Sequence, residues 1–343
     1  MTSPAAERSG IIAGGNWIID HVKTIDSWPP EDSLVNIVSE FHSNGGAPYN
    51  VLKNLSKLGA GFPLQAIGLL GDDRNGDAIA ADCRQCGIDM AQLRRTAGAA
   101  TSYTDVMTVR ATGRRTFFHQ RGANACLLPE HFDFSRTRCR HFHLGYLLLL
   151  DELDRLEHGV PRAAGVLRRA RSAGLTTSVD LVSENSDRFA AVVRPALPEV
   201  DVLFANDFEA ERLTGRPLRR DGRIDRARVE EAARELVGQG VRDWVILHFA
   251  EGACAVSARG ERHWQPSLLL PPGEIRGTAG AGDAFASGVL YSLHSGRGLG
   301  EALRLGVCVA AGSLTHPTCS EGVRPAADSM RLDERWGFRT IGA

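Results

Sequence analysis

Residues 277–285 of this chain are Gly277-Thr278-Ala279-Gly280-Ala281-Gly282-Asp283-Ala284-Phe285. Three glycines in six residues allow the backbone to turn tightly and to approach a ligand closely. Apolar residues then recur every four positions, at Phe285, Val289 and Leu293, which predicts a helix directly after the loop. The free amide hydrogens and the positive dipole end of a helix N-terminus attract anions. The segment therefore predicts an anion-binding loop at the start of a helix.

Asp283 is the unexpected member of this loop, because a carboxylate alone would repel a phosphate group. It fits if it accepts the proton of an attacking hydroxyl group, while the backbone of Gly280, Ala281 and Gly282 holds the charge of a phosphoryl group in transfer. The alternative is an N-cap aspartate of an ordinary helix. A dinucleotide-binding loop is disfavoured, because Phe285 occupies the third glycine position and the segment lies late in the chain. No Gly-x-x-x-x-Gly-Lys-Ser/Thr motif occurs, which excludes a P-loop.

Strand-like and helix-like segments alternate upstream of the loop. Strands are predicted over 142–147, 176–180, 202–205 and 244–248, and a helix over 225–237. Near the N-terminus, residues 11–13 open a strand, and a helix is predicted from about 47 to 58. Such alternation favours an α/β fold, a three-layer sandwich in which helices cover both faces of a mainly parallel sheet.

Residues 101–120 follow a different pattern. Thr, Tyr, Val and Phe are enriched there, and Ala111-Thr112-Gly113-Arg114 supplies a turn, which predicts a β-hairpin. We expect one α/β domain over residues 1–343, with the β segments 35–42 and 101–120 inserted in it as a small lid. An exposed edge with Val, Phe and Tyr side chains invites pairing, so a homodimer through the lid is predicted.

The composition excludes several classes of partner. The formal net charge is −1, from 40 basic and 41 acidic residues, so the chain lacks the excess of positive charge that would attract nucleic acid. The first ten residues lack an apolar leader region, and the apolar run 144–150 is far shorter than the roughly 20 residues of a membrane span. Among seven cysteines, Cys83 and Cys86 form a CxxC without a second pair to complete a zinc site. We therefore expect a cytoplasmic protein.

Taken together, these segments resemble the ribokinase-like carbohydrate kinases, also called the PfkB family. The stretch from Gly280 to Phe285 is similar to the C-terminal signature of that family, and residues 45–51, Gly-Gly-Ala-Pro-Tyr-Asn-Val, are similar to its N-terminal glycine-pair segment. Residues 67–76 resemble its G-x-D-x-x-G region. The resemblance covers nearly the whole chain in the expected order. It implies a ribokinase-like fold and ATP-dependent phosphorylation of a hydroxyl group on a sugar or sugar derivative, with Asp283 as the general base.

The resemblance also implies a substrate site. Asp20 and Asn50 match residues that bind sugar hydroxyl groups in relatives, and an amide can both donate to and accept from a hydroxyl group. Gly45 and Gly46 match the glycine pair that hinges the lid and contacts the sugar through its backbone. Asn124, which follows the hairpin, resembles a further substrate ligand.

A nucleotide and metal site is implied in the same way. Asn206 and Glu209 match an N-x-x-E motif that organises Mg²⁺ near the phosphates, often through water, as suits a hard cation. Asn206 is expected at the nucleotide together with Thr278, Gly280 and Gly282. The implied cofactors are ATP and Mg²⁺.

Three departures from the family pattern change what is expected. Gly277 replaces an aspartate that helps to bind a monovalent cation in several relatives, so a potassium requirement is left open. Leu247 and Phe249 replace a polar residue and a glycine in the turn near ATP, so we expect nucleotide contacts that differ from those of relatives. Gly145 occupies the position of a substrate-binding glutamate of ribokinases, which argues against ribose.

Several alternatives stay open at the level of sequence. The sequence of residues 45–51 is most similar to that of fructokinases. A nucleoside kinase would also fit if Trp17, Tyr49 or Phe118 stacked on a base. A sugar- or nucleotide-binding protein without kinase activity would explain the atypical turn and Gly277. A zinc enzyme built on His141-x-His143 is a more remote alternative, because no third ligand is suggested.

Overall fold

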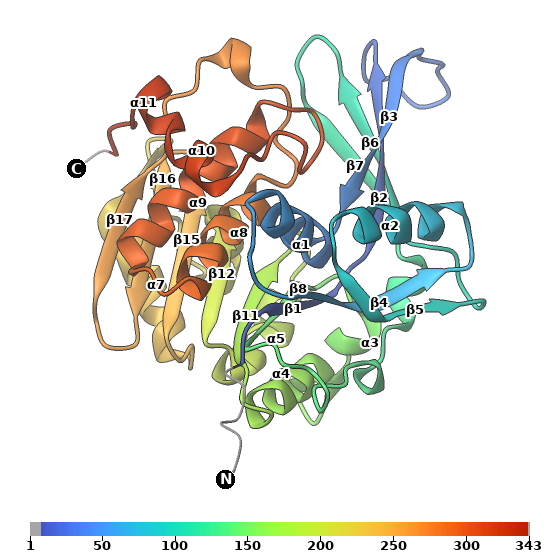
Figure 1. Ribbon diagram of the computed structural model, residues 1–343. Coiled ribbons are helices and arrows are strands. Elements are labelled where there is room, and N and C mark those ends of the chain that lie inside the picture. The colour runs from blue at the N-terminus through green and yellow to red at the C-terminus, as the bar shows by residue number, and fades with distance from the viewer. Residues whose placement is uncertain (1–7, 342–343) are drawn as a thin grey trace.

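A computed structural model describes residues 8–341, and its largest element is a nine-stranded sheet (Figure 1). In their order across the sheet, the strands are β17 (Arg262–Pro266), β16 (Gly252–Ser257), β15 (Trp244–Phe249), β12 (Val202–Asn206), β11 (Thr176–Leu181), β8 (His141–Leu147), β1 (Ile11–Gly15), β4 (Leu64–Gly71) and β5 (Asp89–Thr96). From β15 to β5 neighbouring strands are parallel, and β16 and β17 add an antiparallel edge. The predicted mainly parallel sheet is confirmed.

Helices cover both faces of this sheet, and each face has its own hydrophobic core. One face packs against α1 (Ala47–Lys57), α2 (Arg74–Gln85), α8 (Ala281–His294), α9 (Leu299–Leu314) and α11 (Leu332–Trp336). The other packs against α3 (Asp151–Asp154), α4 (Arg162–Ser172), α5 (Phe189–Val192), α6 (Asp207–Thr214) and α7 (Arg226–Gly238). The three layers are those expected from the alternation of strands and helices.

Shorter elements connect these layers. They are α10 (Ala326–Met330), the strand pairs β9 (Leu156–Glu157) with β10 (Val160–Pro161) and β13 (Arg219–Arg220) with β14 (Arg223–Ile224), and the 3₁₀ turns η1 (Gly122–Cys126), η2 (Pro129–His131), η3 (Arg194–Glu199) and η4 (Pro272–Glu274). Within residues 8–341, no helix combines the length and the apolar character needed to cross a bilayer.

A second, four-stranded sheet projects beside the large one, at the upper right of Figure 1. Its order is β3 (Ile37–Gly45), β2 (Ile18–Ile25), β6 (Tyr103–Val109) and β7 (Arg115–Gln120). The antiparallel pairing of β6 with β7 confirms the predicted hairpin. Sequence reasoning had not assigned β2 to this region, although it lies at the centre of the sheet and continues the chain from β1. We call these four strands the lid, and the rest of the described chain the body.

The parallel strands of the body place their carboxyl ends at one edge of the large sheet, where the loops that follow them gather. Gly15, Leu147, Leu181 and Asn206 end β1, β8, β11 and β12 at this edge. Because β1 leads directly into β2, the lid grows from the same edge. The fold thus brings the lid over the carboxyl ends of the strands.

Candidate active site

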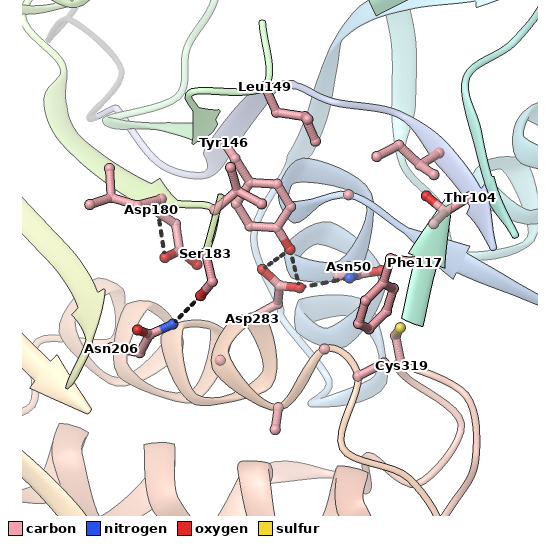
Figure 2. Close-up of a pocket in the computed structure, with 18 of the residues that line it drawn as sticks. Asn50, Thr104, Phe117, Tyr146, Leu149, Asp180, Ser183, Asn206, Asp283 and Cys319 are labelled. Atoms are coloured by element: carbon pink, nitrogen blue, oxygen red, sulfur yellow. Dashed lines mark hydrogen bonds between the residues drawn. The ribbon is translucent and has the colours of Figure 1, made fainter. Parts of the chain in front are cut away.

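A cavity of about 460 Å³ lies where the lid meets this edge of the sheet (Figure 2). From the lid it is lined by Ile18, Asp20, Thr104, Phe117 and His119. From the body it is lined by Gly46, Asn50, Tyr146, Leu149, residues 180–183, Asn206, Glu209, His248, residues 278–283 and Cys319. Segments that are more than 250 residues apart in the sequence, such as Asp20 and the Gly280 loop, therefore share one chamber.

Asp283 lies in the first turn of α8, with its side chain almost fully buried at the wall of the cavity. The Asn50 Nδ2 atom donates to its Oδ2 atom over 2.7 Å, and the Tyr146 hydroxyl group donates to Oδ1 and Oδ2 over 3.0 and 2.8 Å (Figure 2). Burial raises the pKa of Asp283 to about 6, while these two donors act in the opposite direction. The carboxylate is thus held in a defined orientation and is ready to accept a proton near neutral pH.

A further amide fixes the orientation of Asn50. The Asn44 Nδ2 atom donates to the Asn50 Oδ1 atom over 2.6 Å and to the Ser320 hydroxyl oxygen over 2.8 Å. Because the oxygen of Asn50 is occupied in this way, its nitrogen is directed toward Asp283. Sequence reasoning did not identify Asn44, which acts here through its neighbour.

The loop before Asp283 has the geometry expected of an anion site. Gly280 is the N-cap of α8 and has a φ of 71°, a left-handed conformation that favours glycine. A Cβ atom at Gly280 would also lie only 2.6 Å from the Cβ atom of Cys319. Thr278, Gly280, Ala281 and Gly282 all line the cavity. The N-terminal amides of α8 therefore border the same space as the Asp283 carboxylate.

The predicted substrate residues divide into two groups. Asp20, Gly46 and Asn50 line the cavity, whereas Gly45 lies behind Asp20, where an added Cβ atom would be 2.6 Å from its Oδ1 atom. Gly46 is the N-cap of α1 with a φ of 83°, which again favours glycine. Burial raises the pKa of Asp20 to about 7, and the negative charge of Asp283 contributes to this rise.

Asn124 does not line the cavity. Its side chain is buried, its Oδ1 atom accepts from the Trp17 backbone N–H over 3.1 Å, and its Nδ2 atom donates to the Trp17 carbonyl oxygen over 3.2 Å. The amide thus replaces a strand partner for the chain where it passes from β1 into β2. This arrangement gives Asn124 a structural role in joining the lid to the body.

Asn206 and Glu209 form the N-terminal cap of α6. The Glu209 N–H donates to Asn206 Oδ1, and the Asn206 N–H donates to Glu209 Oε2, each over 2.9 Å. Ser183 joins them, since it accepts from Asn206 Nδ2 over 2.8 Å and donates to Glu209 Oε1 over 2.9 Å. Asn206 thus caps α6 and also lines the cavity, so its place in the helix cap leaves it available for the predicted ligand role.

The residues near this cap fit a magnesium ion that is held through water. Asp180, Glu209 and Asp283 are carboxyl groups whose pKa values are raised first of all by burial, and the negative charge of Asp283 raises the pKa of Asp180 and of Glu209 further. A divalent cation would relieve this repulsion. In the part of the chain that the structure describes, no group of three or more His, Cys, Asp or Glu side chains is arranged to enclose a metal directly. If Asn206 and Glu209 contacted a magnesium ion through water, the ion would offset the carboxyl charges without direct protein ligands enclosing it.

A second cavity, also of about 460 Å³, adjoins the first. It is mainly apolar, with Phe249, Leu268, Leu270, Ile275 and Val307 among its lining residues. The residues common to both cavities are Asn206, His248, Thr278, Ala281 and Gly282. A chamber lined by four carboxyl groups and a slot lined by large apolar side chains thus meet at residues 278–282, as suits a ligand with a flat apolar ring at one end and phosphates at the other.

Several site residues were missed by sequence reasoning, among them Tyr146, Asp180, Ser183 and His248. Asp180 was detectable, because it is a charged residue at the end of the predicted strand 176–180 and such ends gather at one edge of a parallel sheet. Tyr146 follows Gly145, and the Tyr146 backbone N–H donates a hydrogen bond to the Asn16 Oδ1 atom. No local sequence pattern predicts that the Tyr146 hydroxyl group reaches Asp283.

The remote zinc alternative is disfavoured by the surroundings of its two histidines. His141 and His143 are buried and both contact the Ser178 hydroxyl group, over 2.7 and 2.8 Å. Burial lowers the pKa of each to about 3. They form a neutral polar cluster inside the sheet.

Comparisons with known proteins agree with this geometry. Residues 13–326 match the family model described as pfkB family carbohydrate kinase. The chain is 30% identical over 331 residues to the ATP-dependent ribose-1-phosphate kinase of Halopiger xanaduensis, covering 94% of this chain and 96% of that protein. It is 27% identical to fructokinase-1 of Oryza sativa subsp. japonica, covering 82% of this chain and 81% of the relative. The solved structure of Arabidopsis thaliana ribokinase complexed with ribose and ATP superposes with a TM-score of 0.76 at 19% identity, covering 94% of this chain and 98% of that one. The ribokinase-like fold is thereby confirmed.

Proposed function

Because the chain belongs to the PfkB family of carbohydrate kinases, we propose that it transfers the γ-phosphoryl group of ATP to a hydroxyl group of a sugar or sugar derivative. The observation that carries this proposal is the buried carboxylate of Asp283. It is oriented by Asn50 and Tyr146 and lies in the first cavity at the N-terminal turn of α8, next to Ala281 and Gly282, which line both cavities.

In the proposed reaction, Asp283 accepts the proton of the acceptor hydroxyl group. The hydroxyl oxygen then forms a bond to the γ-phosphorus atom, and the bond from that atom to the β–γ bridging oxygen breaks. ADP leaves with the electron pair of the broken bond. The amides of Gly280, Ala281 and Gly282 stabilise the negative charge on the transferring group, because their hydrogens point out of the start of α8.

We assign the acceptor to the first cavity. Asp20 and Asn50 bind its hydroxyl groups, and Gly46 approaches it through its backbone. Asn50 would then have two roles, since it also orients Asp283. We propose that the lid closes over the acceptor and excludes the water that would otherwise hydrolyse ATP.

We assign the nucleotide to the second cavity, with its base in the apolar slot and its phosphates directed toward Thr278, Gly280 and Gly282. His248 borders both cavities, and burial lowers its pKa to about 4, so it is neutral near pH 7. Asn206 and Glu209 would hold Mg²⁺ through water, and the ion would supply charge compensation for the phosphates.

The three aromatic side chains that could have served a nucleoside kinase do not support that alternative. Trp17 and Tyr49 are buried and stack on each other with ring centroids 5.5 Å apart, and Phe118 stacks on Trp28 in the loop between β2 and β3. Phe118, Trp17 and Tyr49 are all absent from the lining of the first cavity. We therefore favour a sugar, and the names of the relatives suggest fructose, ribose and ribose 1-phosphate as the first acceptors to test.

Release of ADP from ATP and Mg²⁺ should be measured with these acceptors, with other ketoses and aldoses, and with a set of nucleosides. We expect turnover with at least one sugar and its loss in Asp283→Asn. Absence of turnover with every acceptor, together with retained sugar binding, would instead favour a binding protein of the same fold.

A further inference from the structure

Building on the proposed function, we propose that the acceptor carries an oxyanion, a phosphate or a carboxylate group, and that the guanidinium group of Arg115 in the lid binds it. Arg115 is the first residue of β7. It lies on the same face of this strand as Phe117 and His119, because side chains alternate along a strand. Phe117 and His119 both line the first cavity. The long side chain of Arg115 therefore extends along the margin of the acceptor chamber.

The guanidinium group of Arg115 reaches from the lid to the body. Its Nη2 atom lies only 2.9 Å from the position that a Cβ atom would occupy on Gly277, and Gly277 is buried. The loop at residues 316–317 packs against the same glycine. A side chain at position 277 would therefore collide with the guanidinium group or pair with it. The absence of a side chain leaves Arg115 room beside the start of the anion loop.

This guanidinium group has unused hydrogen-bonding capacity. Its Nη1 atom is buried and has no hydrogen-bond partner among residues 8–341, and none of the ion pairs in this part of the chain includes Arg115. Arginine stays charged under all ordinary conditions, and its planar fork matches the two oxygens of a carboxylate or phosphate. A partly buried guanidinium group whose inner nitrogen has no hydrogen-bond partner among residues 8–341 is costly, so the arrangement suits a site that takes up an anion.

The charges around the first cavity explain why such a group is needed. Its described lining contains the carboxyl groups of Asp20, Asp180, Glu209 and Asp283, and neither a lysine nor an arginine. An anionic acceptor would be repelled by this lining unless a cation stood at its edge. Arg115 supplies that cation at the lid end of the chamber.

The position of Arg115 favours the acceptor over the nucleotide as the source of the anion. The charged or ionisable groups that act on the guanidinium group are Asp20 and Cys319. Asp20 belongs to the acceptor end of the cavity, and Cys319 donates to it over 3.8 Å. The residues shared with the nucleotide slot, such as Asn206 and His248, are not among the groups that act on Arg115.

The test compares Arg115→Gln with Arg114→Gln, a matched control at the exposed neighbouring arginine. The probes are ribose 1-phosphate, fructose 1-phosphate and a keto-deoxy sugar acid, each beside an uncharged sugar. We expect the wild type to prefer an anionic probe, and Arg115→Gln to lose roughly 100-fold in kcat/KM for it, the order expected when one partner of a buried charge pair is removed. In Arg115→Gln, the KM for ATP and the kcat/KM for uncharged sugars should change less than about threefold. In the control variant Arg114→Gln, the kcat/KM for the anionic probes should also change less than about threefold.

A second variant covers the case in which Arg115→Gln folds poorly. Arg115→Lys keeps the positive charge and a long side chain but loses the planar fork of the guanidinium group, so it should retain only part of the wild-type use of anionic acceptors. Equal losses for charged and uncharged acceptors, with a raised KM for ATP, would overturn the proposal and assign Arg115 to the nucleotide phosphates. A wild type that prefers uncharged sugars would overturn it as well.

Binding of the same probes without ATP separates this inference from the proposed function. If the wild type turns over no acceptor, the kinase proposal fails, while weaker binding of the anionic probes to Arg115→Gln would still support the role of Arg115. If turnover occurs but Arg115→Gln and Arg114→Gln bind the anionic probes equally, the anion site fails and the kinase proposal stands.

Discussion

The body and the lid both line the cavity, but they differ in whether their polar groups already have hydrogen-bond partners. In the body, the polar groups at the site are engaged with one another: Asn50 and Tyr146 hold Asp283, and Ser183 joins the cap formed by Asn206 and Glu209. In the lid, His119, which lines the cavity, and Arg115 on the same strand each have a buried nitrogen without a partner among residues 8–341. The buried unpartnered atoms of the body belong to residues that do not line the cavity, namely Asn54, His143, Gln239 and Ser292. The body is therefore organised before a ligand arrives, whereas the lid retains donors and acceptors for one.

This difference suits an ATP-dependent carbohydrate kinase. Preorganised groups around the reacting atoms need no rearrangement during the transfer of charge. Groups that are satisfied only when a ligand is present favour a closed lid over a filled cavity. The variants below test whether the body supplies the chemistry and the lid the recognition.

The largest effect is expected in the body, at Asp283. Asp283→Asn keeps the size of the side chain but removes the base, so kcat should fall about 10³-fold, within the range typical of general base catalysis. Circular dichroism should show an unchanged fold, and the KM for the acceptor should change little. A kcat close to that of the wild type would remove Asp283 from the mechanism.

A smaller effect in the body is expected at Tyr146. Because burial raises the pKa of Asp283 to about 6, kcat/KM should rise as the pH increases through this value and the carboxylate loses its proton. The Tyr146 hydroxyl group lowers this pKa, so Tyr146→Phe should move the midpoint of the pH profile upward and reduce kcat by about tenfold. An unshifted midpoint would mean that the hydrogen bond does not tune the base.

The same burial predicts how stability depends on pH. The folded-state pKa values of Asp20, Glu209 and Asp283 lie at about 7, 7 and 6, above their ordinary values. The folded state therefore binds these protons more tightly than the unfolded state, and the contribution of these groups to the free energy of unfolding falls as the pH rises from about 4 to about 7. Denaturant titrations of the wild type and Asp283→Asn should show a smaller fall in the variant. An identical pH dependence would contradict the assignment of a raised pKa to Asp283.

The smallest effect on activity is expected at the outer surface of the lid. Phe118 and Trp28 are each about half exposed and stack on each other with ring centroids 6.0 Å apart, so the predicted homodimer through the lid can be tested at this apolar pair. Phe118→Asp should convert a dimer to a monomer in light scattering and change kcat less than about threefold, because the side chain does not line the cavity. A wild type that is already monomeric would refute this prediction.

Much of the site was predictable because its chemistry lies in short continuous segments. Gly280–Asp283, Gly45–Asn50 and Asn206–Glu209 each place a special backbone conformation and a polar side chain within a few residues. The helix starts at α1, α6 and α8 depend on local contacts such as the reciprocal cap of Asn206 and Glu209. The three-layer fold followed from the alternation of strands and helices.

Other predictions from similar local patterns needed the packing to be interpreted. Asn124 follows the lid hairpin, as a substrate ligand would, yet its amide is turned to the backbone of Trp17. Ile18–Ile25 continues the first strand in the sequence, yet it pairs with β3 and β6 in the lid. The sequence of each segment alone does not determine these outcomes, because they depend on which distant segment of the same chain packs against it.

The sequence by itself determined the family of folds and the glycine loop that carries Asp283 at the start of a helix, because glycine conformations, helix caps and periodic apolar residues act between neighbours in the chain. Only the tertiary structure decided that Tyr146 reaches Asp283, that Asp180 and Glu209 share its burial, and that Arg115 lies over Gly277 with no hydrogen-bond partner for its Nη1 atom among residues 8–341. These contacts join residues that are tens to hundreds of positions apart. Their geometry arises from the register of the strands and the packing of the helices, which the whole chain sets together.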